Sequence, residues 1–355
     1  MAVAQRTADD VAAMTCRRRD AHGGSVDGAV ETGPHDVVLL SGSGSRHLMD
    51  AVERALGVPE GLPDGLSLGV CTTDRFPDGE VSVRLEESVR GCEVILIGAT
   101  SPPVNDRLVE LLAIVDACRR ANAERLVVIL PYFGYARSDR RDGRRTPIMA
   151  RVAADMIERC GVQQVVVLDA HTPALEGFFN VAVDHLTAVS LLAPALARIA
   201  PSNAVVVAPD QGAVRLAARY AAQLAAPVAV CHKQRLDGAD VRVNRVIGEV
   251  RDRPCIIVDD LISTGGTIAE CARALQEAGA QPHPLVAATH AVFAPGALDR
   301  MATAGVVTLF VTDSIAISPD TPPALVPHVV SLAPMLAAAV RHLHGGTSLR
   351  DLHHG

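Results

Sequence analysis

The chain has 355 residues, enough for two ordinary domains, and its 49% hydrophobic and 21% charged residues are typical of a globular protein. Its net charge of −7 argues against a general nucleic-acid-binding protein, although a few placed Lys and Arg can still make a local anion site. No run of 18 apolar residues and no apolar signal segment occur, and the eight cysteines form no CxxC pair, so we expect a cytoplasmic protein without membrane partners or structural zinc.

Residues 1–36 lack a sustained pattern and are predicted to be a flexible N-terminal extension. From there on, short apolar runs alternate with stretches of helical periodicity. The predicted strands are 36–40, 94–98, 126–130, 165–168, 204–208, 228–231, 255–258, 284–288 and 306–311. The predicted helices are 46–56, 105–121, 147–160, 189–199, 213–223 and 267–278. This alternation predicts an α/β protein with mainly parallel sheets flanked by helices.

Two distant segments resemble one another. Residues 127–137 (VVILPYFGYAR) and 205–215 (VVVAPDQGAVR) both fit VVxxPxxGxxR, and each is followed by a strand that ends in acids. We therefore predict two related α/β domains, 37–185 and 186–330, with 331–355 packing back on the first. Extra residues around CHKQRLDGADVRVN in the second copy predict an inserted loop.

The segment IIVDDLISTGGT at 256–267 is the strongest candidate site. A buried strand would deliver two acids, after which a turn of small residues opens a helix. The N–H groups of such a turn and the helix dipole suit a phosphate dianion, while the acids suit sugar hydroxyls or Mg²⁺. An ordinary capped turn is the alternative, but two adjacent acids on a buried strand are costly without a partner.

This segment resembles the phosphoribosyl pyrophosphate (PRPP)-binding signature of phosphoribosyltransferases and of ribose-phosphate pyrophosphokinases. Further segments are similar to the second family: RFPDGEVSVRLEESVRG at 75–91, residues 105–141, DAHTPALEGFFNVAVDH at 169–185, PDQGAVR at 209–215 and the C-terminal GGTSLRDL. The resemblance runs in collinear order over about 37–352. The chain is thereby identified as a member of the ribose-phosphate pyrophosphokinase family, with some archaeal-type features.

The resemblance implies two phosphoribosyltransferase-like domains and transfer of the pyrophosphoryl group of ATP to the anomeric hydroxyl of ribose 5-phosphate, with Mg²⁺ as cofactor. It assigns ATP binding to Phe76, Asp78, Gly79, Glu80, Arg137, Ser138 and Asp139. It assigns ribose 5-phosphate binding to Asp259, Asp260, Ser263, Thr264, Gly265, Gly266 and Thr267. It assigns metal binding to His171 and Asp210, with Asp169 as a further candidate, and it assigns catalysis to Lys233 and Arg235. In the family the adenine segment reaches a neighbouring subunit's site, which implies a homo-oligomer.

Some positions depart from the family pattern. Ser138 stands where Gln is usual, and Ser263 and Asn180 stand where many members have Asp. Three alternatives stay open: a phosphoribosyltransferase that consumes PRPP, a non-catalytic homologue, and a pyrophosphokinase with a different sugar phosphate or nucleotide donor. The presence of the metal and catalytic candidates argues against the non-catalytic homologue.

Overall fold

The computed structural model describes residues 36–58, 61–141, 143, 145–235, 241–317 and 325–353. The predicted extension, apart from Asp36, lies outside these residues. The chain divides into two compact units. Of the described residues, those of unit 1 lie within 36–167, 172–184 and 333–350, and those of unit 2 lie within 168–171, 185–332 and 351–353.

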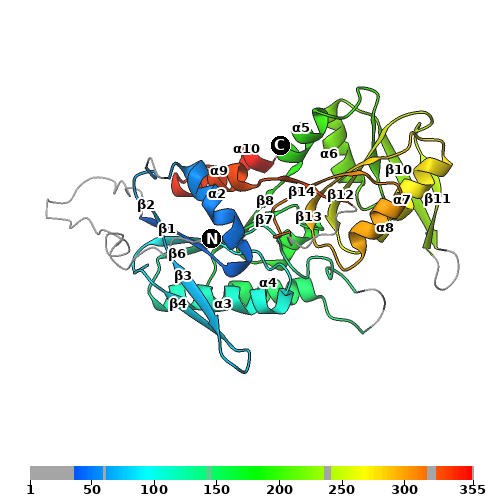
Figure 1. Ribbon diagram of the computed structural model, residues 1–355. Helices are drawn as coiled ribbons and strands as arrows, with labels where there is room; N and C mark the ends of the chain where they lie inside the picture. The colour runs from blue at the N-terminus through cyan, green and yellow to red at the C-terminus, as the bar shows by residue number, and fades with distance from the viewer. Residues whose placement is uncertain are drawn as a thin grey trace. The chain divides into compact units, whose positions relative to one another are not determined.

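Unit 1 is built on a sheet of strand order β2-β1-β5-β6-β7-β8 (Figure 1). Its strands are β1 (Val37–Ser41), β2 (Leu66–Leu68), β5 (Glu93–Ile97), β6 (Arg125–Leu130), β7 (Gln164–Leu168) and β8 (Ala182–Leu186). Its helical segments are η1 (Ser43–Ser45), α2 (Arg46–Leu56), α3 (Val104–Arg120), α4 (Met149–Arg159), η2 (Pro173–Phe178) and α9 (Ala333–His344). Successive pairs from β2 to β7 are parallel, as the continuous apolar runs predict. The C-terminal helix α9 packs against α2.

A separate hairpin projects from unit 1. Strands β3 (Cys71–Arg75) and β4 (Val81–Leu85) pair antiparallel, and β4 packs along α3. The turn between them, residues 76–80, extends away from the sheet (Figure 1). Backbone hydrogen bonds close this turn, from Phe76 N to Glu80 O (2.9 Å) and from Gly79 N to Phe76 O (2.8 Å).

Unit 2 contains a second sheet, of order β11-β10-β9-β12-β13-β14-β15. Its strands are β9 (Val205–Ala208), β10 (Val228–Arg235), β11 (Val241–Ile247), β12 (Cys255–Ile262), β13 (Leu285–Ala291), β14 (Thr308–Thr312) and β15 (His328–Val330). The flanking helices are α5 (Val189–Ala197), α6 (Val214–Leu224), α7 (Gly266–Glu277) and α8 (Ala297–Thr303); α10 (Arg350–His353) ends the described chain. All pairs from β10 to β15 are parallel, so the predicted fold class is confirmed.

The expectation of an inserted loop around residues 231–244 was wrong for its described part. Strands β10 and β11 form an antiparallel pair there, and only residues 236–240 lie outside the described chain. The sequence carries the reason, because Val241 and Val243 alternate with Arg242 and Asn244 in the period of two that a strand requires.

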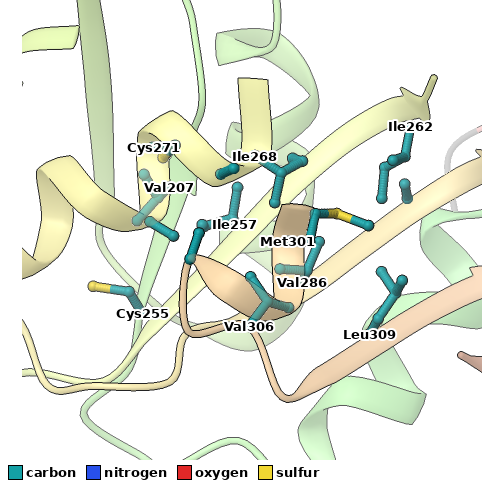
Figure 2. Packing of buried hydrophobic residues seen from close by; sticks show 14 of the residues in the cluster. Val207, Cys255, Ile257, Ile262, Ile268, Cys271, Val286, Met301, Val306 and Leu309 are labelled. Carbon is teal, nitrogen blue, oxygen red and sulfur yellow. The ribbon is translucent and has the colours of Figure 1, made fainter. Parts of the chain in front are cut away.

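A large buried cluster of unit 2 lies between β9, β10, β12, β13 and β14 and the helices α7 and α8. Figure 2 shows its aliphatic side chains, among them Ile257, Ile268, Val286 and Met301, packed together. Burying one such side chain contributes about 1.5–3 kcal/mol, so this cluster holds the N-terminus of α7 firmly against the sheet. No helix in the described part of the chain is long and apolar enough to cross a membrane.

Candidate functional site

The loop between β12 and α7 carries the candidate sugar-phosphate site. Asp259 and Asp260 lie on β12, the chain then turns, and α7 begins at Gly266. Gly265 precedes the helix with φ 71°, in the left-handed region that favours glycine. A Cβ at this residue would come within 2.7 Å of Ala297 O, so the turn also requires glycine sterically.

The carbonyl groups of this turn are bound by neighbouring donors. Ala294 N donates to Ser263 O (2.9 Å), and an Arg300 guanidinium N–H donates to Thr264 O. Before the turn, Ile262 O accepts from Phe293 N (3.1 Å). Carbonyl oxygens repel a phosphate, so holding them on the α8 side favours an anion at the N-terminus of α7.

The pKa values of the two acids of β12 are shifted in opposite directions, and Asp260 lies beside His171. Its Oδ2 lies 2.7 Å from His171 Nδ1. Burial acts to raise the pKa of Asp260, but the hydrogen bond and charge of His171 outweigh it and hold that pKa below its usual value. Burial raises the pKa of Asp259 well above its usual range, and the charges of Asp260 and Asp210 add to the rise. A bound cation would draw Asp259 back to its charged form.

The other two metal candidates also make hydrogen bonds within the fold. Asp210 Oδ1 accepts from Gly212 N (2.9 Å) and Ala213 N (3.2 Å), just before α6. Asp169 Oδ2 accepts from Ala188 N (2.8 Å) and from Thr289 Oγ1 (2.6 Å). Among the described residues, no three His, Cys, Asp or Glu side chains gather so as to hold a metal ion by themselves.

The predicted adenine-binding residues lie in unit 1, at the exposed turn of the β3–β4 hairpin. Phe76 is 55% exposed. Asp78 Oδ1 accepts from Glu80 N (3.1 Å), and Gly79 has φ 94°. These bonds give the turn a defined shape that presents the Phe76 ring to solvent.

The other predicted ATP-binding residues, Arg137, Ser138 and Asp139, follow a turn after β6 in unit 1. Arg137 is exposed and its two successors are half-buried. Ser138 Oγ accepts from Met149 N (3.2 Å), and Ser138 O accepts from Ala150 N (3.1 Å). Ser138 therefore joins the turn to the start of α4, a use of its hydroxyl that the sequence did not predict.

The predicted catalytic residues, Lys233 and Arg235, lie at the end of β10. Their backbones pair with Val243 and Val241 of β11, and the ladder register shifts between His232 and Lys233. The side chains of both residues lie outside what the structure describes.

Sequence reasoning missed two buried residues near His171 and Asp260. Thr289 and His290 end the apolar run of β13, with exposures of 0% and 3%. A Thr-His pair closing the run LVAATH was the available signal, because polar residues at the carboxyl end of a parallel strand often belong to a site.

A buried parallel strand that delivers two acids to a glycine turn and a helix N-terminus is an arrangement of α/β proteins that suits a phosphorylated ligand. The N-terminal domain of ribose phosphate pyrophosphokinase matches residues 37–161, and a phosphoribosyl transferase domain matches 188–322. The ribose-phosphate pyrophosphokinase of Rhodopirellula baltica is 38% identical over 322 residues, 89% of this chain and 98% of that protein. Its counterpart from Staphylococcus aureus is 40% identical over 291 residues, 81% and 90% of the two chains.

Among solved structures, phosphoribosylpyrophosphate synthetase from Mycobacterium smegmatis aligns with a TM-score of 0.79 at 36% identity, over 88% of this chain and 99% of that one. These similarities cover both units. The chain belongs to the ribose-phosphate pyrophosphokinase family.

Proposed function

We propose that this chain transfers the pyrophosphoryl group of ATP to the anomeric hydroxyl of ribose 5-phosphate, giving PRPP and AMP. The observation that carries the proposal is the acid-bearing strand and glycine turn at 259–267, in a chain similar to pyrophosphokinases along nearly its whole length. A phosphoribosyltransferase shares such a loop but does not require the N-terminal domain that matches 37–161.

In the proposed reaction the β12–α7 loop binds the sugar phosphate, with the phosphate at the N-terminus of α7 and the ribose hydroxyls near Asp259 and Asp260. Arg137 and Asp139 bind the ribose and phosphates of ATP. Lys233 and Arg235 neutralise charge that develops on the transferred group. In-line attack at the β-phosphorus needs no covalent intermediate, so positioning and charge neutralisation suffice.

Mg²⁺ fits the donors present in unit 2. It prefers oxygen ligands, keeps several waters and is commonly bound through one or two carboxylates together with substrate phosphates. Asp210 and the Asp259–Asp260 pair offer such oxygens. The bond from His171 Nδ1 to Asp260 orients the ring for a ligand at Nε2, and Asp169 suits the role less because its Oδ2 already accepts two hydrogen bonds. Bound Mg²⁺ would shield the negative charge of the phosphates.

The direct test incubates purified protein with Mg-ATP and ribose 5-phosphate and follows AMP and PRPP. We expect AMP to appear only when the sugar phosphate is present. AMP with another sugar phosphate or nucleotide, but not with this pair, would favour a pyrophosphokinase of altered specificity. Consumption of PRPP with a nucleobase would favour a phosphoribosyltransferase.

We further propose that the hairpin turn at residues 76–80 completes the adenine site of a neighbouring subunit in a homo-oligomer. The exposed Phe76 ring supports this, since stacking on a base contributes about 1–3 kcal/mol. Phe76→Ala should therefore raise KM for ATP at least about fivefold and leave KM for ribose 5-phosphate unchanged. Steady-state kinetics of both substrates check this. Val109→Ala, at another exposed apolar residue of unit 1, is the matched control.

A second prediction concerns Ser263. Placing a carboxylate beside the phosphate should weaken binding, since two charges 4 Å apart in water interact by about 1 kcal/mol. Ser263→Asp is therefore expected to raise KM for ribose 5-phosphate about fivefold, and the neutral Ser263→Asn to raise it less. Equal KM values for wild type and Ser263→Asp would show that the side chain at this position does not affect phosphate binding.

The cytoplasmic location of the protein is proposed on the sequence alone.

A further inference from the structure

A buried polar network lies at the end of β13 in unit 2. Thr289 Oγ1 donates to Asp169 Oδ2 (2.6 Å), and His290 Nε2 lies 3.2 Å from Leu168 O and 3.4 Å from Asp169 O. Because both neighbours of Nε2 are carbonyl oxygens, this nitrogen carries the hydrogen. The other ring nitrogen, Nδ1, faces Ser314 Oγ at 2.9 Å.

His290 is held at both ring nitrogens. Nε2 faces the 168–169 carbonyls as a donor, and Nδ1 lies 2.9 Å from the Ser314 hydroxyl, which also lies 3.2 Å from Thr289 O. His290 therefore donates to the 168–169 backbone at one end and is held by β14 and its following turn at the other.

The network holds the backbone at a strained residue. Asp169 has φ 36°, in the left-handed region, where a residue other than glycine costs on the order of 1–3 kcal/mol. Its carboxylate and its carbonyl are both bound, through Thr289, Ala188 and His290. Two residues later the chain reaches His171, whose Nδ1 lies 2.7 Å from Asp260 Oδ2.

We infer that Thr289 and His290 are positioning residues for pyrophosphoryl transfer: they hold residues 168–169 in the strained conformation that brings His171 to Asp260. The inference rests on the proposed function, in which His171 acts near the triphosphate. Neither residue touches the sugar-phosphate loop through the bonds described, so the effect should fall on turnover more than on ribose 5-phosphate binding.

The test compares Thr289→Val, which keeps the shape and removes the hydroxyl, with Thr289→Ser, which restores it. Thr308→Val, on the neighbouring strand β14, is the control for a threonine lost from the same sheet. We expect Thr289→Val to lower kcat about five- to tenfold with KM for ribose 5-phosphate within about twofold, and Thr289→Ser to recover most of kcat. Amide hydrogen exchange at 168–171 and at Ala188 should accelerate in the valine variant alone.

The combined kcat and exchange results distinguish a positioning role from a role in the fold alone. Faster exchange without loss of kcat would overturn the inference, because the network would then matter only for the fold. Loss of kcat without faster exchange would also overturn it. If Thr289→Val does not fold, His290→Leu serves in its place, because it removes the Nε2 contact to the 168–169 carbonyls. His290→Gln, whose amide can reach those carbonyls, is then the variant expected to recover kcat. A wild-type protein that makes no AMP would instead defeat the proposed function, and the exchange experiment would still report on the network.

Discussion

Lys233→Ala is expected to lower kcat by more than about a hundredfold while the melting temperature changes little. A cation directed at a phosphate in the transition state commonly contributes about 2–4 kcal/mol to lowering the barrier, because the charge it meets grows as the reaction proceeds. Lys233 lies near the end of β10, directly after a shift in the ladder with β11. Such irregularities often occur beside active sites, where they redirect a side chain.

The matched control is Arg245→Ala. Arg245 is an exposed cation on β11, where it pairs with His232, one residue before Lys233. Losing its charge should leave kcat within about twofold, because an exposed charge away from the reacting groups is screened by solvent. Single-turnover rates with saturating ATP and ribose 5-phosphate would compare the variants. A near-normal rate for Lys233→Ala, or an equal loss in both variants, would contradict the catalytic role.

The sheets could be predicted from the sequence because their signal is local. Apolar runs such as 126–130 and 165–168 correspond closely to β6 and β7. The run at 255–258 gave only half of β12, which continues to Ile262. The strand continues past its two acids because Asp259, Leu261 and Ile262 pair with β13, a distant part of the chain. The two acids interrupt the hydrophobic pattern, so the pattern alone does not predict this continuation.

The turn at 263–267 of the candidate site could be predicted because it is contiguous in sequence, whereas hydrogen bonds to distant partners could not. The sequence marked Asp169 as a metal candidate, but its bonds to Thr289 and Ala188 come from segments far along the chain. In unit 1, Glu110 likewise depends on a partner that is distant in sequence. It is 2% exposed and accepts a hydrogen bond from Ser43 N (2.6 Å), 67 residues away. A helical glutamate is ordinarily expected at the surface.

Gly265→Ala should raise KM for ribose 5-phosphate about thirtyfold, equivalent to about 2 kcal/mol, and should also lower the melting temperature. Two causes destabilise the turn in this variant. One is conformational, because φ 71° is unfavourable for alanine. The other is steric. The new methyl would lie 2.7 Å from Ala297 O and 3.1 Å from Met301 Cγ. Met301 is fully buried in the core of unit 2 (Figure 2), so it cannot move aside freely.

Gly296→Ala separates the conformational cause from the steric one. Gly296 precedes α8 with φ 77°, nearly the conformation of Gly265, yet an added Cβ there meets nothing within 4 Å. It should lose about 1 kcal/mol of folding free energy and keep its KM, because no phosphate-binding group moves. Urea unfolding and substrate kinetics on both variants measure the two effects. If Gly265→Ala loses only as much stability as Gly296→Ala and binds ribose 5-phosphate normally, the close approach of α8 does not shape the phosphate turn. If its KM rises while that of Gly296→Ala does not, the packing of α8 against Gly265 holds the N–H groups of the turn where the phosphate binds.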